Sequence, residues 1–254
     1  MPAVPAAHQT LAILRYLSRQ AGPVSAASIV RDLKLPRSTV YHLLATLAED
    51  GFVAHVPEDR RYALGLAAYE LGTGYVRQAP LQRIARVPLA DLVDRVGHSA
   101  HLAVLHGREV VYVIEERAPG RPPLVTDVGV RLPAQLTASG RAMLARLQPA
   151  QVRALFPDPA AFVLRTAAGP RSPSALRALL VDIRRRGHAF EDGEVTTGFA
   201  SIASPVLDHS GHPVAGVAVT FPGAAVPSAA RERVAAQVAR TAATITRRIG
   251  GTPA

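Results

Sequence analysis

Residues 35–51, LPRSTVYHLLATLAEDG, have the pattern of a short helix with one buried face. Pro36 suits the start of a helix, and Gly51 suits its end because glycine adopts the left-handed conformation of a C-terminal cap without strain. Between them, apolar side chains recur at intervals of three and four residues, at Val40, Leu43, Leu44 and Leu47. This spacing predicts a helix that packs one face on a core and presents the other to its surroundings.

The flanking sequence predicts two helices before this one and a β-hairpin after it. Apolar residues within 11–17 form a helical stripe, and Ser25 suits the N-cap of a second helix. After the third helix the period changes, because residues 52–56 and 61–64 resemble short strands joined by four residues with turn chemistry. Three helices followed by a hairpin predict a winged helix-turn-helix, which we assign to residues 1–65.

The exposed face of the third helix carries side chains that suit contact with DNA. The N-terminal residues of a recognition helix meet base edges and phosphates, for which arginine and hydroxyl side chains are suited. The polar face of an isolated amphipathic helix more often only meets water. Here the preceding helix, the turn, the closing glycine and the hairpin follow in the order of a DNA-binding motif, which favours contact with DNA. The predicted DNA-binding residues are Arg37, Ser38, Thr39, Tyr41 and His42 on the helix and Arg60 and Arg61 on the hairpin.

The net charge favours a polyanionic partner without locating its binding site. The 254 residues include 29 Lys+Arg and 19 Asp+Glu, a formal net charge of +10, and contacts between such cations and phosphate release counterions. Residues 1–79 contribute 8 basic and 6 acidic side chains, a net of +2, so +8 lies outside the predicted DNA-binding part. Lys34 is the only lysine.

Absent residue types and segments exclude several classes of protein. The sequence has no cysteine, which excludes disulfides, thiolate metal sites and a cysteine nucleophile. Residues 1–10 lack the basic start and apolar stretch of a signal peptide, and the apolar run 214–226 is too short to span a bilayer. We therefore expect a cytoplasmic protein with no membrane partner.

The second half of the chain mixes helices with strands joined by tight turns. We expect a linker helix within 66–79 and a separate domain over 80–254. The pattern predicts helices near 81–96, 139–147, 174–186 and 228–249, and strands near 98–105, 109–115, 200–207 and 214–221. Tight turns between strands favour an antiparallel sheet with helices packed on it, so the expected fold class is α+β.

Six stretches of the sequence, spread over nearly the whole chain, resemble the IclR family of bacterial transcription regulators. They are LKLPRSTVYHLLATL (33–47), EDGFV (49–53), RYALG (61–65), RLP with ASGRAMLA (within 131–145), RGHAFEDGE (186–194) and GFASIASPV (198–206). The resemblance implies a GAF-like effector domain after the winged helix. It also implies dimers that often pair into tetramers, and effectors that are commonly small carboxylates or aromatic acids.

The resemblance further implies where an effector binds. By position, the family's anion-holding backbone amides fall at Ala138 and Ser139, its polar pocket residues at Glu191, Ser201 and Thr220, and its apolar wall at Leu124, Leu132 and Phe199. The chain departs from the family at four positions. Arg141 stands where the family usually has lysine, and Glu191 stands where it often has Asp. Gly193 stands where the family often has an acidic residue, and Ser201 stands where one branch has Cys. For Glu191, a solvated carboxylate in a loop is the alternative interpretation.

The sequence contains none of the common catalytic motifs. Residues 137–140 lack the first glycine of a Gly-x-Ser-x-Gly nucleophile elbow, and no phosphate-binding or dinucleotide glycine pattern is present. His98 and His101 would point to opposite faces of a strand and His106 falls in a turn, which favours scattered surface or half-buried histidines over a metal site. We therefore predict no catalytic residue, metal or cofactor.

Two functions remain at this stage. The leading hypothesis is a transcription repressor or activator that binds operator DNA and controls a catabolic or secondary-metabolism operon in response to a small organic acid. The alternative is an enzyme or metabolite sensor whose N-terminal module only recruits it to DNA. The first predicts specific duplex binding altered by a small acid, and the second predicts turnover, for which no nucleophile–base pair is visible.

Overall fold

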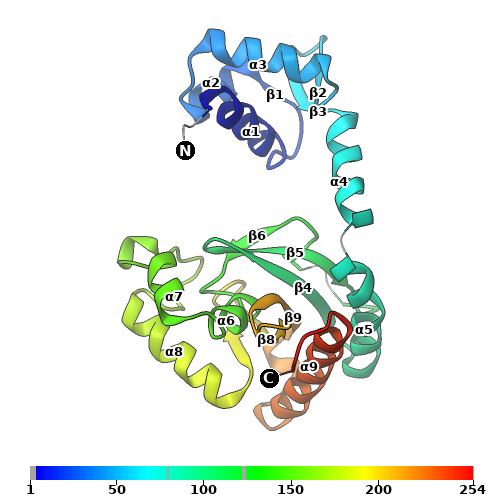
Figure 1. Cartoon of the computed structure of the whole chain (residues 1–254), viewed down its shortest axis with the longest axis vertical. Helices are drawn as coiled ribbons and strands as arrows, with labels where there is room; N and C mark the ends of the chain where they lie inside the picture. Colours follow the sequence, from blue (N-terminus) through cyan, green and yellow to red (C-terminus); the bar gives the residue numbers. More distant parts are fainter. Residues whose placement is uncertain (1–3, 79, 122–123, 254) are drawn as a thin grey trace. The chain divides into compact units, whose positions relative to one another are not determined.

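The chain forms two compact units, Met1–Ala79 and Pro80–Ala254 (Figure 1). The structure is a computed structural model, and it describes residues 4–78, 80–121 and 124–253. Each unit has its own hydrophobic core.

The first unit is a winged helix-turn-helix, as the sequence pattern predicts. Its elements are α1 (Pro5–Leu17), β1 (Val24–Ser25), α2 (Ala26–Leu33), α3 (Arg37–Glu49), β2 (Val53–Val56), β3 (Arg61–Leu64) and α4 (Leu66–Gln78). A three-stranded antiparallel sheet has the order β1-β3-β2. The strand β1 was not predicted, since two residues are too few to show an alternating pattern.

The core of the first unit confirms the predicted helical stripes. The buried apolar residues include Ile13 of α1, Ile29 of α2, and Val40, Leu44 and Leu47 of α3. The Ser25 hydroxyl accepts a hydrogen bond from the Ser28 amide at 3.1 Å and so caps α2 as expected. The exposed residue Lys34 ends α2 in the left-handed conformation, with φ 54° and ψ 38°, and thereby turns the chain toward α3.

The second unit is built around a six-stranded antiparallel sheet of order β6-β5-β4-β9-β8-β7. Its strands are β4 (Ser99–His106), β5 (Glu109–Glu116), β6 (Arg131–Pro133), β7 (Ala189–Asp192), β8 (Phe199–Leu207) and β9 (Pro213–Pro222). Its helices are α5 (Pro80–Val96), α6 (Ala138–Leu144), α7 (Pro149–Leu155), α8 (Pro173–Arg186) and α9 (Ser228–Arg248), with single turns η1 (Pro159–Ala161) and η2 (Gly223–Ala225). The α+β prediction is therefore confirmed, although β6, α7 and β7 were not predicted.

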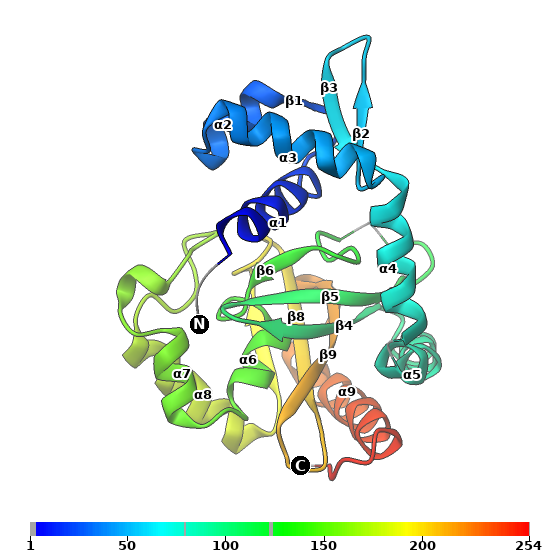
Figure 2. The same ribbon diagram turned by 45° about the horizontal axis from the view of Figure 1, so that its top comes forward.

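Helices cover both faces of this sheet. On one face, α5 and α9 pack on large apolar side chains such as Val217 and Val219, and on the other, α6 packs on small ones such as Ala203 and Ala218. Figures 1 and 2 show α6, α7 and α8 on the side of the sheet opposite α5 and α9. The small residues let α6 approach closely, since a Cβ added at Gly216 would lie 2.9 Å from the Ser139 carbonyl oxygen. A cavity lies on this same face, beside the start of α6.

Candidate functional site

The exposed face of α3 carries the side chains predicted to meet DNA. Arg37, Ser38, Tyr41 and His42 are exposed, while Thr39 is half-buried. The Arg37 guanidinium lies over the Tyr41 ring, 5.6 Å from its centroid, one helical turn further along. This face offers a cation, hydroxyls and an imidazole in the first two turns of the helix, and such side chains suit contacts with base edges and phosphates.

The hairpin of the first unit presents the two predicted arginines differently. Both Arg60 and Arg61 are exposed, and Arg60 lies in the turn with a φ of 49°. Arg61 begins β3 and donates a hydrogen bond to the Pro23 carbonyl oxygen at 3.2 Å, so part of its guanidinium is already used within the unit. Arg60 is consequently the freer of the two for a phosphate.

In the second unit a cavity lies on the α6 face of the sheet, at the start of α6. The centre of a water molecule can occupy about 60 Å³ of this cavity. One bound water needs roughly 10–15 Å³ on the same measure, so the cavity has room for a compact ligand of several non-hydrogen atoms. The polar residues lining it are Tyr112, Thr126, Thr137, Ser139, Glu191, Thr196, Ser201 and Thr220. The apolar ones are Leu124, Val125, Ala138, Val195, Phe199 and Ala218.

Three of the polar residues form a row across neighbouring strands. Glu191 of β7 is paired with Ser201 of β8, which is paired with Thr220 of β9, and side chains in register point to the same face of a sheet. The Ser201 hydroxyl donates to Glu191 Oε1 at 2.9 Å and lies 2.9 Å from the Thr220 hydroxyl. Because Ser201 has one hydroxyl proton, Thr220 donates to Ser201 in this arrangement.

Glu191 is a buried carboxyl and not a solvated one, with 3% of its surface exposed. Its Oε2 accepts a hydrogen bond from the Glu194 amide at 3.2 Å. Burial, together with the neighbouring Glu194 carboxyl, raises the pKa of Glu191 to about 8, against the lowering effect of the Ser201 hydrogen bond. At neutral pH Glu191 therefore holds a proton for most of the time and has the capacity to donate a hydrogen bond.

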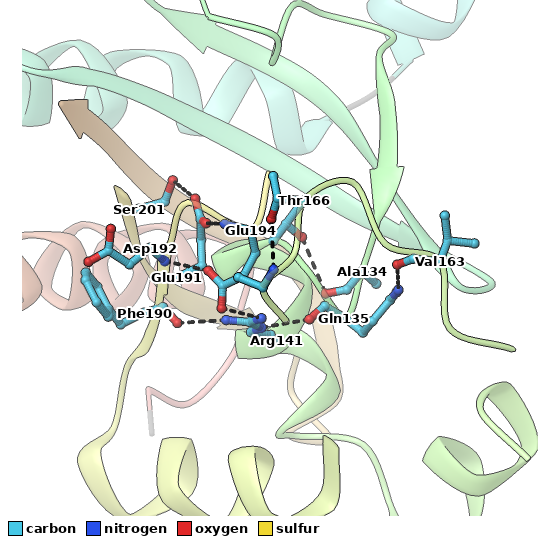
Figure 3. Close-up of polar contacts among 12 residues, drawn as sticks. Ala134, Gln135, Arg141, Val163, Thr166, Phe190, Glu191, Asp192, Glu194 and Ser201 are labelled. Carbon is cyan, nitrogen blue, oxygen red and sulfur yellow. Dashed lines mark hydrogen bonds and ion pairs between the residues drawn. The ribbon is translucent and has the colours of Figure 1, made fainter. Parts of the chain in front are cut away.

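The buried residue Arg141 anchors the loop that carries Glu194. Arg141 donates to the Gln135 carbonyl oxygen at 2.7 Å and to the Phe190 carbonyl oxygen at 3.1 Å, and pairs with Glu194 Oε1 at 2.9 Å (Figure 3). A planar guanidinium reaches three acceptors in different directions, whereas an ammonium is a compact point charge. The arginine at this position thus fixes the residue whose amide supports Glu191.

The start of α6 leaves polar groups without partners at the cavity. The Thr137 hydroxyl caps the helix by accepting from the Gly140 amide at 3.1 Å. Among the described residues, the backbone amides of Ala138 and Ser139 donate no hydrogen bond, and the buried Ser139 hydroxyl has no partner at hydrogen-bond distance. It faces the Tyr112 hydroxyl closely enough to lower the pKa of that group, against the larger effect of burial. A buried hydroxyl without a partner costs free energy, so these groups favour a ligand that accepts hydrogen bonds.

Comparison with known proteins identifies the chain. Residues 73–247 match the family described as "Bacterial transcriptional regulator IclR C-terminal", and residues 6–57 match "IclR helix-turn-helix domain". The chain belongs to the IclR family. It is therefore a DNA-binding transcriptional regulator with a C-terminal domain for a small-molecule effector, and it is not an enzyme.

Individual relatives agree with this assignment of the IclR-family chain. It is 34% identical over 209 residues to the glycerol operon regulatory protein of Streptomyces coelicolor, covering 82% of this chain and 81% of the relative. The crystal structure of Thermotoga maritima IclR matches with a TM-score of 0.71 at 27% identity, over 96% of this chain and 98% of that one. An IclR homologue from Microbacterium hydrocarbonoxydans, complexed with 4-hydroxybenzoate, shares the fold with a TM-score of 0.80 at 22% identity, over 96% of this chain and 98% of that one.

Seven of the eight residues predicted for the effector line the cavity of this IclR-family domain. The exception is Leu132, which is 2% exposed on β6 and packs in the core beneath α6. Sequence reasoning missed Tyr112, Thr126, Thr137 and Thr196 among the polar lining. Thr137 was visible as a hydroxyl at the predicted start of a helix, and Ala218 follows from Thr220 by alternation along a strand.

The histidines set aside as metal ligands are more buried than predicted. His98 is 7% exposed just before β4, and His101 is 1% exposed within it, so the expectation of surface or half-buried histidines was wrong for both. Burial lowers the pKa of His101 to about 3. No cluster of three potential metal ligands occurs in the described residues. Within the same residues, no helix is long and apolar enough to cross a bilayer.

Proposed function

We propose that this IclR-family regulator binds operator DNA through α3 and the β2–β3 hairpin, and that a small organic acid in the α6 cavity alters this binding. The regulated genes on this proposal form a catabolic or secondary-metabolism operon. The observation that carries the proposal is the buried Ser139 hydroxyl, which has no partner at hydrogen-bond distance among the described residues, in a cavity that the Glu191 carboxyl also lines.

The chemistry of the cavity favours a compact acid with one apolar edge. A ligand carboxylate accepts hydrogen bonds, which matches the Ser139 hydroxyl and the neighbouring amides, and protonated Glu191 donates a further one. Leu124, Phe199 and Ala218 supply apolar wall. The bound 4-hydroxybenzoate of the Microbacterium homologue and the glycerol operon of the Streptomyces relative support an effector of this size and a catabolic target.

The gating mechanism on this proposal is a change in the spacing of paired DNA-binding domains. Helix-turn-helix dimers match half-sites roughly 34 Å apart, so the proposal requires a homodimer, or a tetramer made of two dimers. A ligand shifts this equilibrium only by binding one arrangement more tightly than the other.

The test is fluorescence anisotropy on DNA from upstream of the chain's own gene, with a scrambled duplex in parallel at several salt concentrations. We expect tighter binding to the upstream duplex and a shift in that affinity on adding 4-hydroxybenzoate or a related small acid from a panel. Equal and steeply salt-dependent binding to both duplexes would show only charge-driven attraction and would count against the proposal.

A cavity-filling variant locates the effector site. Ala218→Leu places three further carbon atoms where the ligand would lie, so we expect it to bind DNA and to lose the response to the acid. The matched control is Ala178→Leu, which adds the same group to the exposed face of α8. A response that survives Ala218→Leu would place the effector elsewhere.

A further inference from the structure

A second hollow lies in the effector domain, between α7 and α8, and shares no lining residue with the α6 cavity. Its volume is about 390 Å³, within the roughly 300–1,000 Å³ typical of small-molecule pockets. The two helices lie side by side in Figures 1 and 2, and their facing sides form the walls of this groove.

Both helices present a continuous face to the groove. From α7 and its C-cap the lining residues follow an i, i+3, i+4, i+7 pattern, at Pro149, Val152, Arg153 and Phe156. From α8 they keep the same spacing, at Pro173, Leu176, Arg177, Leu180, Val181 and Arg184. Residues with this spacing share one side of a helix, so the groove is a regular surface of two helices and not an accident of a loop.

The floor of the groove is apolar. Phe156 and Leu176 are each 1% exposed and Leu180 is 2% exposed, so they also belong to the core beneath. Val181 stands higher on the wall with 54% of its surface exposed. An apolar wall that remains open to water favours a partner with an apolar body.

The rim of the groove is positive and uncompensated. Arg153, Arg177 and Arg184 line it, and no lining residue is acidic. In the described part of the chain, Arg153 and Arg177 have no ion pair, and Arg184 donates only to the Ala145 carbonyl oxygen at 3.2 Å. The nearest acidic side chain along α8, Asp182, is instead paired with Arg185 at 2.7 Å and Arg186 at 2.5 Å.

We propose that the α7–α8 groove is a second ligand site, which binds a small organic anion with an apolar body, such as a medium-chain carboxylate. The apolar floor takes the body and the three arginines take the carboxylate, for which the guanidinium has matching geometry. A volume of about 390 Å³ lies in the size range of small-molecule pockets, so we assign the groove to a small molecule. The site is independent of the effector proposed for the α6 cavity.

A local reporter tests the groove directly. The sequence contains no tryptophan, so Val181→Trp places a single indole on the groove wall. Titration with octanoate is expected to change its fluorescence saturably, whereas 1-octanol, which has the same number of carbon atoms and no charge, binds at least roughly tenfold more weakly. The matched control is Val87→Trp, an exposed valine on α5 with 61% exposure, whose fluorescence should not respond.

Charge variants in the same background test the rim. Arg153→Gln with Arg177→Gln is expected to weaken octanoate binding roughly tenfold, as the loss of two exposed charge pairs implies, and to leave 1-octanol unchanged. Arg86→Gln with Arg233→Gln removes the same charge from exposed positions of α5 and α9 and should have no effect.

The proposal is overturned if octanoate leaves the Val181→Trp signal unchanged, if octanol binds as tightly as octanoate, or if only an acidic amphipathic peptide changes the signal. Loss of the response to the α6-cavity effector would not bear on these outcomes.

Discussion

The polar face of α3 and the polar row of the α6 cavity differ in what their side chains already bind. On α3, Arg37 lies over the Tyr41 ring and otherwise faces outward. In the cavity, by contrast, Glu191, Ser201 and Thr220 are hydrogen-bonded to one another and supported from behind by Arg141 and Glu194. The side chains of the first surface are the ones that we propose to bind DNA, whereas those of the second bind one another within the folded domain. Substitutions on α3 should therefore change DNA affinity without changing the free energy of unfolding. Substitutions in the cavity network should change both effector binding and the free energy of unfolding.

The largest effect on stability is expected at Arg141. Arg141→Ala removes a partner of the partly buried Glu194 carboxylate and of two backbone carbonyl oxygens, so we expect the free energy of unfolding to fall by about 3 kcal/mol or more. Chemical denaturation measures this, with exposed Arg233→Ala as the control, expected within ~0.5 kcal/mol of wild type. An equally small loss for both variants would mean that the network behind the cavity does not stabilise the fold.

On α3 the expected effect is on DNA affinity alone. Arg37→Ala should weaken specific operator binding by roughly tenfold or more, as the loss of a base or phosphate contact implies. Its unfolding free energy should stay within ~0.5 kcal/mol of wild type, since the side chain is exposed. Anisotropy and denaturation are measured on the same preparation, with Arg19→Ala as an exposed arginine of the same unit away from α3. If Arg37→Ala lowered the free energy of unfolding by as much as it lowered the free energy of operator binding, α3 would not differ from the cavity in the way described above.

The pH dependence of stability tests Glu191. The folded state holds its proton up to a pKa of about 8, above the ordinary value of 4.5. Between those two values the unfolded state binds fewer protons, so this group's contribution is fully present below pH 4.5 and is lost as pH rises toward 8. Glu191→Gln, which mimics the protonated form, should therefore flatten the decline in the free energy of unfolding between those limits. Parallel curves for the variant and wild type would mean that Glu191 is ionised in the folded protein.

The smallest effect on stability is expected at Ser139. Its hydroxyl has no partner to lose among the described residues, so Ser139→Ala should change the free energy of unfolding by less than about 0.5 kcal/mol in either direction. The same variant should weaken binding of a carboxylate effector, measured by calorimetry with 4-hydroxybenzoate or the active acid of the panel. Ser204→Ala is the control, since this buried hydroxyl also lacks a partner but does not line the cavity.

These differences also explain how far the sequence could predict the molecule. The recognition helix follows from a local period, so the buried positions Val40, Leu44 and Leu47 and the outward side of Arg37 were visible in 17 residues. The row of Glu191, Ser201 and Thr220 depends on the register of β7, β8 and β9, which no local pattern specifies. Only the family resemblance pointed to those residues, and it also pointed to Leu132, whose side chain the register of β6 places in the core.

The unpredicted contacts are of the same long-range kind. The Arg141–Glu194 pair joins residues 53 positions apart, and neither residue type is expected inside a core unless it is paired. Likewise, β1 has only two residues, too few for alternation to be seen, and it exists because β3 offers it a hydrogen-bonding edge. The strand β7 similarly depends on its pairing with the edge of β8.

The left-handed residue that ends α2, Lys34, gives the chain a single lysine at which it can be labelled. Since Lys34 is the only lysine, its side chain carries the only ε-amino group that an acylating reagent meets. That amine lies in the turn between the two helices of the DNA-binding motif and is exposed. A fluorophore attached there sits beside α3 at a single defined position in every copy, and the rate of its attachment measures how far bound DNA shields the turn.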